Sequence, residues 1–207
     1  RPNLSYTVRQ TEDTYEQLLR IIRGVEGSGI IYMRSREGVE QLAELLQKDG
    51  INAGFYHAGL PSLERSMRQD DWQHDKVRIM VATNAFGMGI DKADVRFVVH
   101  YSICDSLEAY YQEAGRAGRD GRRSYAVLLA SPSDTPRLEQ RLKAEFPPID
   151  DIKHIYQSIA AYLQVAIGDG KDASFVFNIY DFCHREHIYT GKVISALKLL
   201  EMNGYIS

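Results

Sequence analysis

Short apolar runs alternate with segments of helical periodicity over the first 130 residues, and this alternation is the feature that most constrains the fold. The runs read GSGIIYM, INAGFYH, KVRIMVAT, VRFVVHY and SYAVLLA. Largely apolar strands are typical of parallel sheets that are buried on both faces, and each parallel crossover requires a helix. The sequence therefore predicts an α/β domain over residues 1–131, in which helices cover both faces of a parallel sheet.

The remaining residues follow a different pattern. Residues 132–148 carry four prolines and no strand pattern, which predicts a helical linker. Beyond the linker, the periodicity predicts a short strand in SFVFN and three helices, at 150–166, 178–187 and 191–203. Thr190 is the expected N-terminal cap of the last helix. The order of these elements over residues 149–207 predicts a small, mostly helical, winged-helix-like domain with a truncated wing.

Charge and cysteine content restrict the classes of function. The formal net charge is −3, so any binding of nucleic acid must come from a local basic patch. Cys104 and Cys183 match no zinc spacing, and CHREH matches no metalloprotease pattern, so no metal is predicted. Without an apolar run of about 18 residues, we expect no membrane partner and a cytoplasmic location, associated with the nucleoid if the source is bacterial. The chain opens at Arg1 without a methionine, so we expect a fragment of a longer protein.

The loops after the expected strands are the candidate sites, because ligands of parallel sheets bind beyond the carboxyl ends of the strands. A further candidate, QEAGRAGRDG, lies just past a predicted helix, and in it Arg116 and Arg119 stand three residues apart between glycines. Guanidinium groups match phosphate oxygens in geometry, and glycines let the backbone approach a ligand closely. A helix end followed by a solvated basic turn is an equally good interpretation of this motif alone. In VATNAFGMGIDKADV, Asp91 follows glycines and suits a ribose hydroxyl or an arginine partner.

Taken together, these motifs resemble the second motor domain of superfamily 2 helicases, and specifically that of the RecQ family of DNA helicases. The resemblance covers Arg1 to about Ala130 and rests on RPNLSY, GIIYMRSR, YHAGL, VATNAFGMGIDKADVRFVVHY and EAYYQEAGRAGRDG in family order. It implies a RecA-like fold for this part of the chain.

The resemblance also implies roles for individual residues. Arg116 and Arg119 match the arginine pair that reaches ATP on the other motor domain, so they are the expected catalytic residues. Gln112, Asp91 and Gly89 match positions close to the nucleotide. Contacts with the phosphates of the translocated strand are expected from six residues: Ser35, Arg36, His57, Gly59, Thr83 and Asn84.

A RecQ-type helicase uses ATP and Mg²⁺ to move 3′ to 5′ along DNA in recombination and repair. Because the sequence has neither GxxxxGK[ST] nor DExH, the missing N-terminal motor domain is expected to hold most of the ATP and Mg²⁺. This chain alone is therefore expected to be inactive. Its expected partners are single-stranded DNA, duplex junctions and that motor domain. Many family members carry a four-cysteine zinc module where this chain has a cysteine-free linker, so no zinc is expected.

Two other functions remain open at this point. One is a translocase that acts on RNA with the same motor. The other is a non-catalytic DNA-binding or regulatory module that lacks the P-loop domain.

Overall fold

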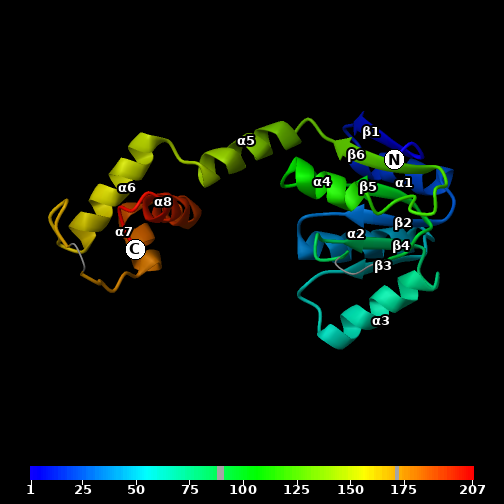
Figure 1. Ribbon diagram of the computed structural model, residues 1–207, viewed down its shortest axis with the longest axis horizontal. Coiled ribbons are helices and arrows are strands. Elements are labelled where there is room, and N and C mark those ends of the chain that lie inside the picture. Colours follow the sequence, from blue (N-terminus) through cyan, green and yellow to red (C-terminus); the bar gives the residue numbers. More distant parts are fainter. Residues whose placement is uncertain (88–90, 171–172) are drawn as a thin grey trace. The chain divides into compact units, whose positions relative to one another are not determined.

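The chain divides into two compact units, Arg1–Asp134 and Thr135–Ser207, in a computed structural model that describes residues 1–87, 91–170 and 173–207 (Figure 1). The first unit holds a six-stranded sheet in the order β1-β6-β5-β2-β4-β3, and its described pairings are all parallel. The strands are β1 Leu4–Gln10, β2 Ser28–Tyr32, β3 Ala53–Tyr56, β4 Ile79–Ala82, β5 Val95–His100 and β6 Ser124–Ala130. The helices are α1 Thr14–Gly24, α2 Arg36–Lys48, α3 Ser62–Gln73 and α4 Leu107–Ala114.

Neighbouring residues along the central strands enter two different apolar clusters, because successive side chains of a strand point to opposite faces. Ile31 and Val99 pack with α1 and α2 on one face of the sheet. Ile30 and Val98 pack on the other face with Trp72 of α3 and with α4. This arrangement confirms the predicted parallel sheet with helices on both faces.

The first strand is one that the apolar pattern does not predict. Six of the seven residues of β1 are exposed, and the strand pairs in parallel with β6 from Leu4 to Gln10. A strand at the edge of a sheet has a neighbour on one side alone and needs no apolar run. Just before it, Asn3 Nδ2 donates to the carbonyl oxygens of Gly118 at 2.8 Å and Arg122 at 2.9 Å. The start of the chain therefore supports the turn that carries the two arginines.

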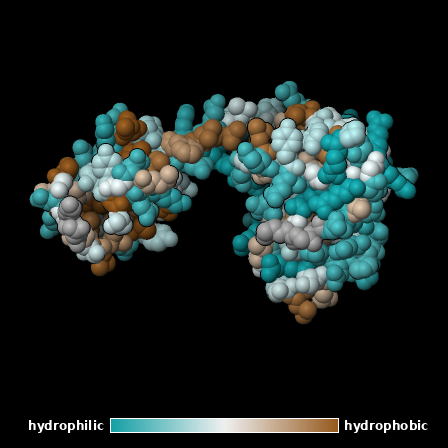
Figure 2. All heavy atoms as spheres, in the orientation of Figure 1, coloured by the Kyte–Doolittle hydropathy of each residue, from teal (hydrophilic) through white to brown (hydrophobic). Residues whose placement is uncertain are grey.

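The second unit is built on helices. Its elements are α5 Asp134–Glu145, which begins at the last residue of the first unit, α6 Ile149–Tyr162, α7 Ile179–Glu186 and α8 Thr190–Met202. Ile155, Phe182 and Val193 form its buried core. Figure 2 shows apolar patches on this unit, whereas hydrophilic residues cover most of the visible face of the first unit. No helix among the described residues is both long and apolar enough to cross a membrane.

Two local predictions for this unit are wrong. Residues 174–178, SFVFN, form no strand. Phe177 packs into the helical core while Val176 is 97% exposed, and the described residues of the unit offer no strand with which this segment can pair. Thr190 is the first residue of α8 and not its cap. Tyr189 occupies the cap position, and its side chain makes no capping hydrogen bond.

Candidate functional site

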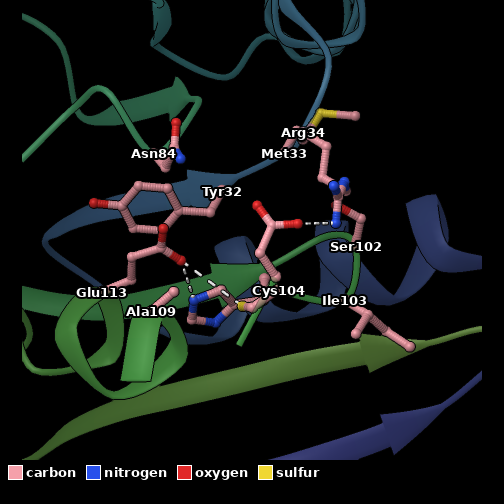
Figure 3. A pocket seen from close by; sticks show the side chains of 11 residues that line it. Tyr32, Met33, Arg34, Asn84, Ser102, Ile103, Cys104, Ala109 and Glu113 are labelled. Atoms are coloured by element: carbon pink, nitrogen blue, oxygen red, sulfur yellow. Dashed lines mark hydrogen bonds and ion pairs between the residues drawn. The ribbon is translucent and has the colours of Figure 1, made fainter. Parts of the chain in front are cut away.

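A pocket of about 100 Å³ lies at the carboxyl ends of the three central strands, β5, β2 and β4 (Figure 3). Its wall comes from three of the loops expected to carry ligands, through Arg34 after β2, Asn84 after β4 and Cys104 after β5. Glu113 of α4 completes the wall. The parallel topology therefore brings together loops that are distant in the sequence.

The arginine turn follows α4 directly. Gly118 has a φ of +66°, and a Cβ there would lie 2.6 Å from Asn3 Nδ2 and 2.8 Å from Ser124 Oγ. A side chain at this position has no room, so the glycine allows the turn to approach the start of the chain. Beyond it, Arg119 Nη1 lies 2.8 Å from Asp91 Oδ1. The side chains of Arg119 and Asp91 are 36% and 85% exposed, so water screens this ion pair.

Arg116 lies against the glycine loop that follows β4. Its Nη1 donates to the Gly87 carbonyl oxygen at 2.5 Å, and its Nε is buried with no hydrogen-bond partner among the described residues. The phenol of Tyr32 donates to the Phe86 carbonyl oxygen at 2.9 Å. Burial raises the pKa of this phenol, although the nearby Arg116 charge acts in the opposite direction. A half-buried guanidinium with an unused Nε donor suits an anionic ligand.

Lys92 secures the loop that carries Asp91. Its side chain is 5% exposed, and its Nζ lies 2.9 Å from Asp75 Oδ1 and 3.2 Å from Asp94 Oδ1. The ammonium also lies 5.7 Å from the centre of the Trp72 ring. Lys92 beside Asp75 holds the pKa of that carboxyl below its usual value. The residue next to Asp91 is thus anchored to the core by charge and by packing.

The two other nucleotide-side predictions have different outcomes in the structure. Gln112 is exposed on α4, next to the buried Glu113. Gly89 lies outside the described residues.

Four of the residues expected to contact DNA gather at the start of α2 and after β3. Ser35 caps α2, and its Oγ accepts from Gly38 N at 2.9 Å, which leaves the hydroxyl hydrogen as a donor. Arg36, the first residue of α2, lies against Gly59, where a Cβ would approach Arg36 Nη1 to 3.0 Å and His57 Nδ1 to 3.2 Å. Gly59 therefore allows the loop after β3 to approach this guanidinium.

His57 and Thr83 are less accessible than the prediction requires. His57 is 5% exposed, and its Nε2 lies 2.6 Å from Glu40 Oε1. Thr83 is 7% exposed, and its amide donates to the Tyr56 carbonyl oxygen at 3.2 Å. Asn84 is exposed and lines the pocket. Ser35, Arg36, Gly59 and Asn84 thus face solvent, whereas His57 and Thr83 support the loops that present them.

The sequence reasoning missed a buried cluster in the same pocket. His100 Nε2 lies 2.9 Å from Glu113 Oε2, and neither residue is more than 8% exposed. Cys104 Sγ lies 3.8 Å from the same carboxylate oxygen. Burial, and next the charge of Glu113, raise the pKa of the Cys104 thiol to about 12. The signal that could have found the cluster is a histidine at the end of an apolar strand, followed by an acid inside the arginine motif.

Comparison with known proteins defines the class to which this fold and these loops belong. Residues 13–121 match the family model described as the helicase conserved C-terminal domain, so the chain belongs to that family.

Relatives narrow the family further. The chain is 44% identical over 167 residues to the ATP-dependent DNA helicase RecQ of Haemophilus influenzae, a match covering 79% of this chain and 27% of that protein. It is 50% identical over 137 residues to the ATP-dependent DNA helicase hus2/rqh1 of Schizosaccharomyces pombe, covering 65% of this chain and 10% of that protein. The chain is a C-terminal helicase segment of RecQ type and spans under a third of each of these relatives.

Solved structures agree on the fold. The yeast DEAD-box splicing factor Prp28 matches with a TM-score of 0.61 and 25% identity, over 68% of this chain and 32% of that one. A DEAD box protein from the hyperthermophile Methanococcus jannaschii matches with a TM-score of 0.58 and 26% identity, over 69% of this chain and 40% of that one. These matches confirm the RecA-like fold.

Proposed function

We propose that this chain is the nucleotide-coupling and DNA-gripping half of an ATP-dependent DNA helicase of RecQ type, which moves 3′ to 5′ and acts in recombination and repair. The observation that carries the proposal is the convergence of Arg116, Arg119 and Asp91: Arg116 donates to the Gly87 carbonyl oxygen, and Arg119 pairs with Asp91 farther along the same connection between β4 and β5. We further propose a cytoplasmic location, associated with the nucleoid if the source is bacterial.

The chain's own residues fit the arginine role in two ways. Arg116 is hydrogen-bonded to the Gly87 carbonyl oxygen, and it keeps a buried Nε that no described residue satisfies. Arg119 is held by Asp91 in a solvent-exposed ion pair, which an incoming phosphate can replace at little cost. Bound ATP with Mg²⁺ supplies the phosphoryl group whose transfer to water drives movement. Arg116 and Arg119 donate to its phosphate oxygens, while the N-terminal motor domain holds most of the nucleotide.

Asp91 then acquires a second role. Once Arg119 turns towards a phosphate, the carboxylate is released to accept from a ribose hydroxyl, as Gln112 and Gly89 complete the nucleotide side. Lys92 fixes the adjacent backbone through Asp75 and Asp94, so Asp91 does not drift when its partner leaves.

DNA is gripped through its phosphates, without reading of sequence. Ser35, Arg36, Gly59 and Asn84 supply the exposed contacts, and His57 and Thr83 hold the loops behind them. Residues 132–148 form the linker of this proposal, and residues 149–207 form its winged-helix-like domain. The net charge of −3 means that these local contacts, and not the overall charge, provide the attraction.

The test is ATP hydrolysis by the full-length protein that contains this chain, with single-stranded DNA, RNA of the same sequence, or no nucleic acid. We expect strong stimulation by DNA, weak stimulation by RNA, and displacement of a duplexed strand when the single-stranded tail has 3′ polarity. A non-catalytic module would bind DNA without any hydrolysis. That outcome would overturn the proposal.

One observation favours an RNA translocase as the second candidate, namely the structural match to a splicing factor. The identity to that structure is 25%, against 44% and 50% for the two DNA helicases, so DNA is the better supported substrate. Equal or stronger stimulation by RNA in the same assay would reverse this order.

A further inference from the structure

Three metal-binding side chains meet in the pocket wall, although no spacing in the sequence predicts a site there. His100 is the last residue of β5, Cys104 lies in the loop that follows, and Glu113 lies in the last turn of α4. One ligand atom from each, a ring nitrogen, the Sγ and a carboxylate oxygen, falls within 4.8 Å of the other two. Figure 3 shows Cys104 and Glu113 on the same side of the pocket.

Two of the three separations between these atoms are close to those of a zinc site, and the third, between the His100 ring nitrogen and Cys104 Sγ, is at most 4.8 Å. With Zn–S of about 2.3 Å and Zn–N and Zn–O of about 2.0–2.2 Å at tetrahedral angles, neighbouring donor atoms lie about 3.4–3.6 Å apart. Here His100 Nε2 and Glu113 Oε2 are 2.9 Å apart, and Cys104 Sγ and Glu113 Oε2 are 3.8 Å apart. Each of these two separations needs to change by only a fraction of an ångström to admit the ion.

We propose that His100, Cys104 and Glu113 form a zinc site, with water from the pocket as the fourth ligand. Thiolate and imidazole select Zn²⁺ over Mg²⁺ and Ca²⁺, which prefer oxygen ligands alone. Three protein ligands and an open fourth position are a common arrangement around this ion. The pocket of about 100 Å³, lined by all three residues, has room for that water.

The charges at the site balance when zinc is present. One thiolate and one carboxylate together neutralise a divalent ion, so the burial of Glu113 no longer depends on His100 alone. Cysteine binds zinc as the thiolate, so the Cys104 proton has to leave when the ion enters. Zinc therefore displaces that proton on binding. The other charged residues of the pocket, Arg34 and Asp105, form an ion pair, and Asp105 adds a second negative charge close to Cys104.

The ring of His100 limits the affinity of this site. When Nε2 binds zinc, the ring proton moves to Nδ1, and this buried atom has no hydrogen-bond acceptor among the described residues. Ligating histidines ordinarily donate that proton to a carboxylate or carbonyl oxygen, and loss of such a partner costs about 10–100-fold in metal affinity. We therefore infer a zinc site of moderate affinity, one that a chelator empties readily.

Zinc at this place would link β5, its loop and α4 close to the catalytic motif. Glu113 stands between Gln112 and the turn with Arg116, so the ion would hold the end of α4 against the sheet. The zinc site itself rests on its three ligands and not on the proposed helicase function, because its test measures metal binding alone.

The experiment is a zinc titration of the untagged 207-residue chain after removal of metals with a chelator, read by competition with a chromogenic zinc indicator. We expect one zinc per chain in the wild type. Cys104→Ser should weaken zinc binding by at least about tenfold, as should Glu113→Gln. Cys183→Ser is the matched control, because Cys183 is the other cysteine of the chain and lies in α7 of the second unit, and the variant should bind zinc as the wild type does.

Cobalt gives a second readout that does not depend on affinity. We expect a thiolate-to-cobalt absorption band in the wild type and in Cys183→Ser, and none in Cys104→Ser, with circular dichroism confirming that each variant is folded. Three results would overturn the proposal: no zinc bound by the wild type, unchanged zinc binding by folded Cys104→Ser, or loss of zinc binding in Cys183→Ser.

Discussion

Replacement of Gly87 by alanine is the most informative perturbation of the arginine turn. Gly87 has a φ of +138°, and a Cβ at this position would overlap Cζ and Nη2 of Arg116 and lie 2.5 Å from its Nε. An alanine at this position would be held in a backbone conformation that L-residues avoid. Its methyl group would also push the Arg116 guanidinium away from the carbonyl oxygen of residue 87.

The expected loss of stability has two parts, the backbone strain and the lost hydrogen bond. A residue held in a sparsely populated backbone region costs about 1–3 kcal/mol. A lost hydrogen bond to a charged group costs about 1.5–3 kcal/mol more. We therefore expect Gly87→Ala to lower the free energy of unfolding by about 2.5–6 kcal/mol, as both terms apply. The loss of Arg116 from its place should also lower the rate of DNA-stimulated ATP hydrolysis.

Gly50→Ala is the matched control. Gly50 follows α2 with a φ of +76°, and no atom lies within 4 Å of the place that a Cβ would take, so the control carries backbone strain without a clash. We expect it to cost about 1–2 kcal/mol and to leave the rate of ATP hydrolysis unchanged.

The assay is urea unfolding of the 207-residue chain, followed by the fluorescence of Trp72, the one tryptophan and a fully buried residue of the first unit. Hydrolysis is measured separately in the full-length protein. If Gly87→Ala loses no more stability than Gly50→Ala and keeps the full rate of hydrolysis, the close packing of Arg116 on Gly87 has no functional meaning.

Three further perturbations test other parts of the structure. Phe97→Ala should lower the free energy of unfolding by about 3–5 kcal/mol, because the ring is fully buried in the sheet, and an unchanged urea midpoint would contradict this. Lys92→Met should destabilise the chain most at neutral pH. Lys92 depresses the pKa of Asp75, so that contribution is present above the unfolded pKa of about 3.8 and is lost as the pH falls through the lower folded value. In a pH series of unfolding curves the difference from wild type should shrink below about pH 4, while the exposed control Lys76→Met should differ little at any pH. The thiol of Cys104, with its pKa raised to about 12, should react slowly with iodoacetamide at about pH 8 until the chain is unfolded, and rapid alkylation of the folded chain would refute its protected environment.

The apolar runs predicted five of the six strands and the parallel sheet, because each run is buried and its neighbours are helices. They did not predict β1, whose edge position imposes no apolar pattern. SFVFN shows the opposite case, since its residues favour a strand but the described part of the second unit provides no partner strand.

The sequence predicted which loops carry the candidate site, but it did not predict which side chains contact each other there. The motifs indicated Arg116, Arg119 and Asp91, and the structure joins Arg119 to Asp91. The contact between His100 and Glu113 depends on how α4 packs on β5, and no local pattern encodes that distance. His57 likewise contacts a residue that is distant in the sequence, Glu40 of α2, and no local pattern predicts that contact.

The most direct test of the central claim is the rate of DNA-stimulated ATP hydrolysis by the full-length protein, for wild type, Arg119→Ala and the exposed control Arg20→Ala, with binding of single-stranded DNA measured in all three. The coupling role predicts that Arg119→Ala lowers the rate by about a thousandfold or more, while DNA binding and the control stay at the wild-type level. Full hydrolysis by Arg119→Ala, or none by the wild type, would contradict the account and favour a non-catalytic DNA-binding module.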